Sequence, residues 1–354
     1  MNPIRAWNDF WFRPISARPL GAFRIIFGLV VLLNLALLSL ELDYWFTDHG
    51  LLQGTEAREA AGPLRPSLLQ HVQDPVSVRV FFGAMAAVVV LFTLGWHTRL
   101  MGVLLYLGML SIHHRNISSA NGADVLLIVL AFYAMLCPCG AAYSLDARRA
   151  SRKRGGTLAE PLIVPWAQRL IQIELTLVYL NTALLKAGGS SWQDGTALHF
   201  VLNNAEVRRF SLGLPNYPLL INFMTYGALM VEFTIPFLIW FKKARPWVMF
   251  LGVGLHATIG IFVNIPIFGE LMIASYLTFL GPDEFDRFLR YLNPRNWFRK
   301  AAAVPVDPTG RAALGIAGRF DTPSEPAGPH WVSQEVSEAD LEHAGFRREW
   351  DDAP

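Results

Sequence analysis

The chain has 354 residues, of which 53% are hydrophobic and only 16% are charged, and its formal net charge is +2. Soluble globular proteins carry about 25% charged residues, and the mean hydropathy here is positive, at +0.33, so the composition disfavours an ordinary water-soluble enzyme. Residues 301–354 hold ten acidic residues and four arginines, a net charge of −6, which leaves +8 on the first 300. This division predicts a membrane domain over residues 1–300 and an acidic, largely disordered tail over residues 301–354.

Eight apolar stretches are candidates to cross a bilayer, which takes about 20 apolar residues per helix. Isolated strands are not viable at membrane depth, because their backbone groups would lack hydrogen-bond partners. The sequence therefore predicts an all-α, polytopic membrane protein with about eight transmembrane helices. In chain order the stretches are 20–40, 78–94, 100–112, 125–143, 170–187, 219–241, 247–263 and 267–280. The third and the eighth are the shortest.

The lysines and arginines are divided unevenly between the two sides that eight crossings would create. Eighteen fall on one side and about six on the other. Because loops rich in Lys and Arg stay in the cytoplasm, both termini are predicted to be cytoplasmic, in a multi-pass protein of the inner or plasma membrane. The basic linker over residues 147–165 directly flanks a span, which indicates contact with membrane lipid rather than with nucleic acid.

Ionisable side chains inside the apolar stretches are costly and usually face the interior of a helix bundle. Arg24 lies about 6 Å inside the first span, so it either lines a pocket or extends to the cytoplasmic surface. Glu232 lies near the middle of the sixth span, where contact with lipid is hard to accommodate. His256 lies in the seventh span and is either a hydrogen-bonded core residue or a ligand or base.

The fifth stretch carries a polar stripe formed by Gln172, Thr176, Tyr179, Thr182 and Lys186. These residues fall within an arc of about 120° on a helix, so this face is expected to line a polar interior. A Gly/Ser turn after Lys186 leads to Trp192. Such a turn allows the segment with Trp192 to fold back over the helix end and to shield the Lys186 amine from water. An amine that loses its proton in such a site can act as a general base. The alternative is that Lys186 simply extends to the outer surface.

An ordered set of short motifs runs along the chain. They are Phe23-Arg24-Ile-Ile-Phe-Gly28, Asn121-Gly-Ala-Asp124, Pro138…Tyr143-Ser-Leu-Asp146 and Tyr179…Lys186…Trp192…Gly195, with His256 in a late span. Together they resemble the horizontally transferred transmembrane domain (HTTM) family, whose animal member is vitamin K-dependent γ-carboxylase. The resemblance spans roughly residues 14–285.

The resemblance implies a quinol-dependent carboxylase or epoxidase. In the carboxylase, a lysine in a Tyr…Lys…Trp…Gly stretch acts as the base toward vitamin K hydroquinone, and the oxygenated product then removes the γ-proton of a glutamate. By this resemblance Lys186 is the catalytic base, reduced vitamin K (a menaquinol-type quinol) is the cofactor, and a peptide or protein is the substrate. The residues expected around the base are Arg24, Tyr179, Trp192, Glu232 and His256.

Two other functions stay open at this point. One is a non-catalytic membrane factor for peptide maturation or export, since some members of the family assist peptide toxin production. The other is a structural membrane subunit. The carboxylase also carries a histidine near the position of Asn121 that this chain lacks, although His113 and His114 lie a few residues upstream. No metal is predicted, because adjacent histidines cannot share one helix face and Cys137 and Cys139 lack a second ligand pair.

Overall fold

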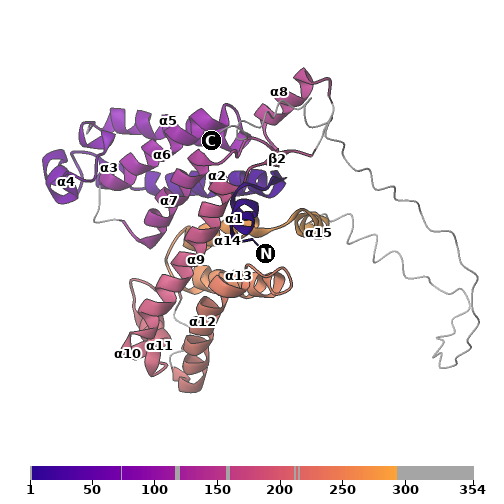
Figure 1. The fold of residues 1–354 in the computed structure, drawn as a ribbon. Coiled ribbons are helices and arrows are strands. Elements are labelled where there is room, and N and C mark those ends of the chain that lie inside the picture. The colour runs from indigo at the N-terminus through magenta and orange to yellow at the C-terminus, as the bar shows by residue number, and fades with distance from the viewer. Residues whose placement is uncertain are drawn as a thin grey trace, which may run out of the picture. The chain divides into compact units, whose positions relative to one another are not determined.

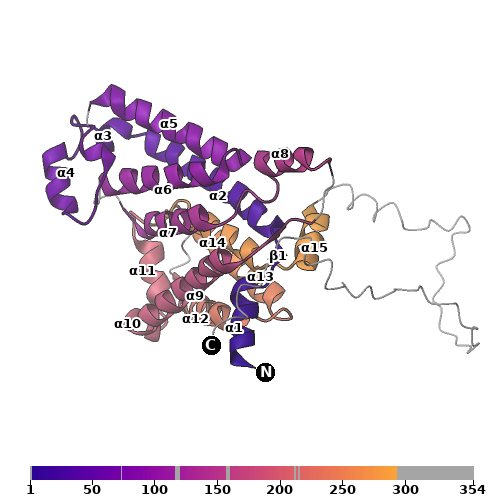
Figure 2. The ribbon, with the colours of Figure 1, turned by 45° about the horizontal axis from the view of Figure 1, so that its top comes forward.

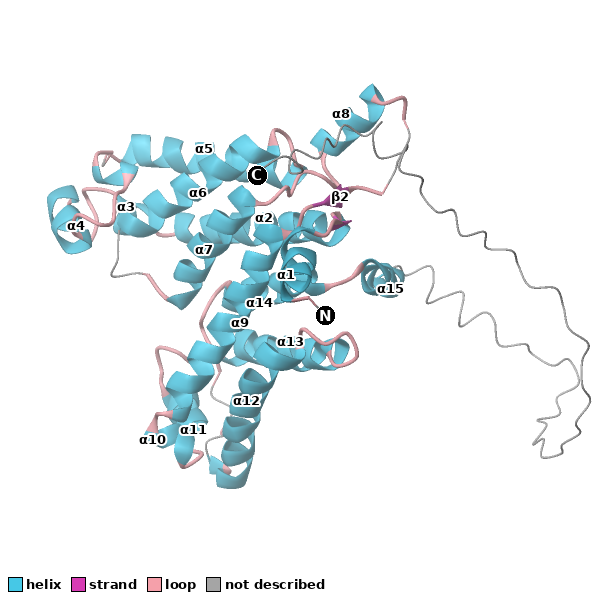
Figure 3. Cartoon of the chain, in the orientation of Figure 1, coloured by secondary structure: helices cyan, strands magenta, loops and turns pink. Residues whose placement is uncertain are grey.

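The structure is a computed structural model that describes residues 2–72, 74–115, 120–156, 160–210, 213 and 216–292. These residues all belong to the first of two compact units, Met1–Arg299. The acidic tail predicted over residues 301–354 lies outside the described residues. Within the described part the regular structure is almost entirely helical, and the two-residue strands β1 (Ile15–Ser16) and β2 (Leu162–Ile163) form the only sheet (Figure 3).

The elements follow one another along the described chain as in Figure 1. The first group comprises α1 (Pro3–Phe12), β1 (Ile15–Ser16), α2 (Arg18–Ser39), α3 (Leu42–Phe46), α4 (Gly54–Ala61), η1 (Leu68–Gln70), α5 (Pro75–Leu94), α6 (Thr98–Arg115), α7 (Gly122–Leu136) and α8 (Leu145–Lys153). The second comprises β2 (Leu162–Ile163), α9 (Trp166–Ala187), α10 (Ser190–Gln193), α11 (Ala197–Asn203), α12 (Pro218–Leu238), α13 (Arg245–Phe262), α14 (Phe268–Tyr276), η4 (Leu277–Phe279) and α15 (Pro282–Leu292). Helix α9 joins the two groups, because it contacts both α7 and α12.

Five of the described helices are long and apolar enough to cross a membrane: α2, α5, α9, α12 and α13. Each coincides with a predicted span, which confirms the all-α, polytopic fold class. Helix α7 has 15 residues and the apolar segment Phe268–Phe279 is shorter still. At 1.5 Å per residue they measure about 22 and 18 Å, short of a hydrocarbon core of about 30 Å. Helix α6 has 18 residues but is not among the five, so the count of eight crossings stays a prediction.

The short apolar helices pack among other helices. Helix α14 contacts α2, α7, α9 and α13, and Leu271 and Met272 on it are buried. A helix enclosed by neighbours can be short, since those neighbours supply the contact with lipid. Helix α7 ends before Pro138, earlier than the predicted boundary at 143. Proline forces the preceding residue, Cys137, into extended backbone, which ends the helix.

The connection between α2 and α5 is folded. It contains α3, α4 and η1; α3 packs against α5, and α4 lies beyond the end of α5 (Figure 2). Asp74 begins α5 by accepting a hydrogen bond from the Ser77 N–H at 2.9 Å, as an N-cap residue does. Gly95 ends α5 with a φ of +73°, a left-handed conformation that favours glycine.

Candidate functional site

The polar stripe of α9 faces other helices. Gln172 Nε2 donates a hydrogen bond to the carbonyl oxygen of Thr278 at 2.5 Å. Further along the helix, Thr182 Oγ1 lies 3.4 Å from a carboxylate oxygen of Glu232 on α12. Tyr179, between them, is 2% exposed. The stripe therefore lines the interior of the bundle, where buried polar groups need protein partners.

Lys186 and Glu232 form an ion pair near the C-terminal end of α9. Lys186 Nζ donates a hydrogen bond to Glu232 Oε1. The Glu232 side chain is 7% exposed, whereas the Lys186 side chain is 29% exposed. The carboxylate is thus nearly enclosed while the amine stays accessible, so a ligand can reach Lys186 and a proton can pass directly between the two groups.

The Gly/Ser turn after α9 brings Trp192 beside Lys186. Gly188 caps α9, and α10 follows Gly189 directly. A Cβ at Gly189 would lie 3.3 Å from Trp192 Cδ1, so glycine leaves room for the indole ring. The ring centroid lies 5.1 Å from Lys186 Nζ, within the range of a cation–π interaction. The aromatic face and the amine therefore border the same space.

A buried hydrogen-bond chain lies on the same face of α9. Tyr179 Oη lies 2.6 Å from His256 Nε2 on α13 and contacts the hydroxyl of Tyr276 on α14. The three side chains are 2%, 3% and 1% exposed, respectively. Because a phenol hydroxyl both donates and accepts, the chain can relay a proton between buried groups. His256 is thus a hydrogen-bonded residue of the interior.

Sequence reasoning missed Tyr276, and the one signal that bears on it is a glycine. Gly252 lies one turn before His256 on α13, and a Cβ there would lie 1.9 Å from Tyr276 Oη. We expect Gly252→Ala to displace that hydroxyl from Tyr179 and to lower the free energy of unfolding by about 1–3 kcal/mol. Gly254→Ala is the matched control, because a Cβ at Gly254 meets nothing within 4 Å. Denaturant titration of both variants in detergent tests this, and equal stabilities would contradict it.

Pro236 lies inside α12, one turn after Glu232. Proline has no backbone N–H, so the carbonyl oxygen of Glu232 lacks the helical donor that residue 236 would otherwise supply. Helix α12 continues past Pro236 to Leu238, so one backbone hydrogen bond is missing at the residue that pairs with Lys186. This feature was not identified from the sequence.

The structure does not bring Arg24 into this cluster. The side chain is fully buried, and its guanidinium donates hydrogen bonds to the carbonyl oxygens of Cys139, Ala142 and Tyr143 at 2.9, 3.3 and 2.7 Å. These carbonyls lie between α7 and α8, outside any helix. Arg24 therefore neither extends to the membrane surface nor lies beside Lys186, which corrects its expected place in the pocket. It closes the turn after α7.

The Asn-Gly-Ala-Asp motif caps a helix. Asn121 Oδ1 accepts a hydrogen bond from the Ala123 N–H, and Asp124 Oδ2 accepts one from the Asn121 N–H, both at 2.8 Å. This reciprocal arrangement is a capping box that begins α7. Asp124 Oδ1 also lies 3.4 Å from Nδ1 of the buried His113. The motif therefore has a structural role at the start of α7.

Asp146, in the next motif, binds the start of α6. Its carboxylate accepts hydrogen bonds from the His97 N–H at 3.0 Å, the Thr98 N–H at 2.8 Å and Thr98 Oγ1 at 2.7 Å. Burial opposes ionisation of this carboxyl, but the hydrogen bonds from Thr98 and His97 outweigh it and lower the pKa of Asp146 below its usual value. The motif thus joins the segment after α7 to α6.

Metal-binding side chains do not gather in the described part of the chain, which contains no group of three or more His, Cys, Asp or Glu residues that could hold an ion. Cys137 and Cys139 are buried free thiols. The side chains of the cluster offer a ligand an amine, a carboxylate, an indole ring and the Tyr179–His256–Tyr276 chain.

The fold and the cluster define a multi-pass helical membrane protein with a polar interior among α9, α12, α13 and α14. Residues 12–283 match the HTTM domain family; because the match covers most of the chain, the chain belongs to that family, and the family predicted from the motifs is confirmed. Sporulation-delaying protein SdpB of Bacillus subtilis (strain 168) is similar, at 22% identity over 220 residues. The similar region covers 59% of this chain and 66% of SdpB, slightly less than two thirds of its length. No solved structure matches significantly.

Proposed function

We propose that this HTTM-family protein is a membrane enzyme that removes a proton from a lipid-soluble substrate, with Lys186 as the general base. The Lys186–Glu232 ion pair carries the proposal. Transfer of the ammonium proton to Glu232 leaves a neutral amine, which can then accept a proton from a bound substrate. The accessibility of Lys186 and the enclosure of Glu232 support this division of roles.

The substrate class that we propose is a reduced quinone of the vitamin K type. The reaction is oxidation of the quinol to its epoxide by molecular oxygen, or carboxylation driven by that oxidation, in which carbon dioxide replaces the proton removed from the second substrate. The residues present fit a flat aromatic diol, because Trp192 offers a ring beside the amine. The neighbouring Leu184 and Leu185 are 56% and 70% exposed and extend an apolar surface toward lipid. When bound, a quinol supplies hydroxyl protons and reducing equivalents. Lys186 would hold the proton and Trp192 would orient the ring; a peptide or protein glutamate is the proposed second substrate.

The proposed orientation places both termini in the cytoplasm. Helix α8 supports this, since it carries a cluster of basic residues: Arg148, Arg149, Arg152 and Lys153. Such clusters stay on the cytoplasmic side. The next span, α9, would then carry Lys186 to the outer side of the membrane, where a lipid quinol and an exported peptide can both reach it.

Replacing Lys186 tests the enzymatic proposal. Membranes that contain the full chain are supplied with vitamin K hydroquinone, and epoxide formation is measured by chromatography. We expect Lys186→Ala to lower the rate about 100-fold or more, the usual contribution of a general base. Lys186→Arg is expected to fail as well, because a guanidinium does not deprotonate in proteins. Lys242→Ala, at an exposed loop position, is the control. Epoxide formation unchanged in Lys186→Ala would refute the assignment.

A second candidate is a non-catalytic membrane factor for peptide maturation or export. The similarity to sporulation-delaying protein SdpB favours it, and a charged Lys186–Glu232 pair would serve such a factor without losing its proton. This function predicts that Lys186→Arg stays active, because arginine preserves the charge. Comparing the secreted peptides of host strains that carry the wild type, Lys186→Arg or Lys186→Ala separates the two functions. Normal peptide secretion in the arginine strain, with no quinol consumption by wild-type membranes, would favour the factor over the enzyme.

A further inference from the structure

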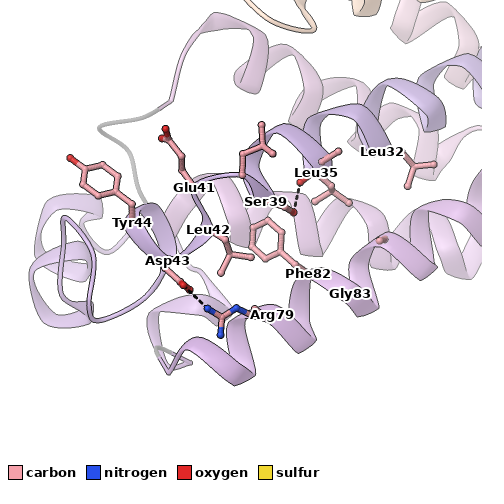
Figure 4. Close-up of a pocket in the computed structure, with 13 residues that line it drawn as sticks. Leu32, Leu35, Ser39, Glu41, Leu42, Asp43, Tyr44, Arg79, Phe82 and Gly83 are labelled. Atoms are coloured by element: carbon pink, nitrogen blue, oxygen red, sulfur yellow. Dashed lines mark hydrogen bonds and ion pairs between the residues drawn. The ribbon is translucent and has the colours of Figure 1, made fainter.

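The turn after α9 carries Trp192 in α10 and continues to Gly195 before α11 begins. Its backbone folds on itself, since the Trp192 N–H donates a hydrogen bond to the carbonyl oxygen of Gly189 at 3.1 Å. None of these residues lines the cleft of about 1000 Å³ that α2, α3 and α5 form (Figure 4). The indole ring of the turn lies beside Lys186 Nζ instead, so what holds this turn also decides where the ring stands.

Tyr226 attaches the turn to α12, the helix that packs against α9. Its hydroxyl donates a hydrogen bond to the carbonyl oxygen of Gln193, the residue after Trp192, at 2.8 Å. Gln193 Nε2 in turn donates to the carbonyl oxygen of Ala187, at the C-terminal end of α9, at 3.0 Å. Gln193 is thus bonded to both helices. The indole ring next to it is held in place from two sides.

Gly195 allows the Tyr226 ring to lie against the turn. Its φ is +79°, and a Cβ there would lie 2.9 Å from Cε2 and 3.0 Å from Cζ of the Tyr226 ring. Glycine meets both requirements, because other residues disfavour this φ and their Cβ would displace the ring. The glycine that closes the Tyr…Lys…Trp…Gly stretch is therefore explained by its contact with Tyr226.

Helix α12 thus holds both the amine and the aromatic ring of the cluster. Glu232 pairs with Lys186, and Tyr226, six residues earlier, holds the segment that carries Trp192. Six residues rise about 9 Å along a helix, so both attachments come from one stretch of fewer than two turns. The turn by itself gives little support, since Gln193 is exposed. The distance between amine and ring is therefore set from α12.

We propose that Tyr226 is a positioning residue, which holds the Trp192 ring beside the Lys186 amine and so sets how tightly the site binds a flat aromatic substrate. Its hydroxyl bonds to the turn and not to Lys186 or Glu232. Loss of that hydroxyl therefore weakens substrate binding and leaves proton transfer within the ion pair unchanged. The effect on the substrate rests on the proposed function, whereas the position of Trp192 does not depend on it.

Fluorine NMR of the full chain in detergent, labelled with fluorotryptophan, tests the positioning without any substrate. The chain has 11 tryptophans, and the resonance that disappears in Trp192→Phe is that of Trp192. Tyr226 is 45% exposed, so Tyr226→Phe keeps the fold and deletes only the hydroxyl. We expect it to shift the Trp192 resonance and to leave the others in place. Tyr217→Phe, at a position 63% exposed just before α12, is the matched control. An unmoved Trp192 resonance in Tyr226→Phe would refute the proposal.

A second comparison tests whether Tyr226 holds the ring beside the amine. Lys186→Met removes the cation next to the indole and should shift the Trp192 resonance when Tyr226 is present. In the Tyr226→Phe background the same change should give a smaller shift, because the ring has moved away from residue 186. Equal shifts in the two backgrounds would show that Tyr226 does not set this distance.

Gly195→Ala approaches the same contact from the turn. The added Cβ pushes against the Tyr226 ring, so this variant should shift the Trp192 resonance as Tyr226→Phe does. Gly227→Ala is the control, because a Cβ at Gly227 meets nothing within 4 Å. A wild-type spectrum in Gly195→Ala would contradict the role given to the contact between Gly195 and Tyr226.

Kinetics in membranes supplied with vitamin K hydroquinone tests the effect on the substrate. We expect Tyr226→Phe to raise KM about fivefold, the factor that one hydrogen bond is worth, and to leave kcat at the wild-type value. A fall in kcat at unchanged KM would refute a role in binding. Absence of epoxide from wild-type membranes would refute the proposed function and the substrate effect with it. The fluorine spectra would then still decide whether Tyr226 positions Trp192.

Discussion

Replacing Glu232 with leucine is expected to lower the free energy of unfolding by about 2–3 kcal/mol. The change leaves the Lys186 ammonium without its carboxylate in a setting where water is scarce, and breaking a buried ion pair from one side costs about 3–5 kcal/mol. The 29% exposure of the Lys186 side chain reduces this, because part of the charge can find solvent. Denaturant unfolding in detergent measures the effect.

The double variant Lys186→Met with Glu232→Leu sharpens this prediction. Removing both charges leaves none unpaired, so the double variant is expected to be more stable than Glu232→Leu alone. Glu270→Leu, at an exposed position on α14, is the control for a leucine replacing a glutamate. If the double variant is less stable than Glu232→Leu, the ion pair is not what the single change disrupts.

Arg24→Met is expected to destabilise the protein by about 3 kcal/mol. The variant removes the donors for three carbonyl oxygens in the turn after α7, and a buried acceptor left unsatisfied costs about 1–3 kcal/mol. The guanidinium is closely packed, since a Cβ at Gly95 would lie 2.7 Å from Arg24 Nη1. This packing leaves little room for another donor to reach the three carbonyl oxygens. Thermal and denaturant unfolding in detergent both report the loss.

An exposed arginine provides the control for this variant. Arg148 is exposed on α8, and Arg148→Met should change stability by less than about 0.5 kcal/mol. Arg24→Lys should fall between the two, because an ammonium cannot reproduce the planar fork of a guanidinium. Wild-type stability in Arg24→Met would show that the three carbonyls find other donors.

Some of the contacts among the candidate site residues could be expected from the sequence, and others could not. The stripe on α9 could be read because its residues share one helix face, a property set by the helical repeat alone. Tyr276 could not be read in this way, since nothing near it in sequence indicates that it meets Tyr179. We predicted Arg24 in the pocket, but its hydrogen-bond partners are backbone carbonyl oxygens. Every residue has a backbone carbonyl, so the sequence does not indicate which ones a buried arginine binds.

The sequence by itself determined the five long apolar helices α2, α5, α9, α12 and α13, because about 20 consecutive apolar residues are a local property that needs no partner to be recognised. It also determined the family, through motifs of which one caps a helix locally, while Arg24 and Asp146 in two others bind segments distant in the chain. Only the tertiary structure decided that Lys186 meets Glu232, that Tyr276 completes the hydrogen-bond chain, and that residues of α2, α3 and α5 line a cleft (Figure 4). These contacts join segments that are distant in the chain, and they depend on how closely helices approach, which is set by packing on all sides of each helix at once.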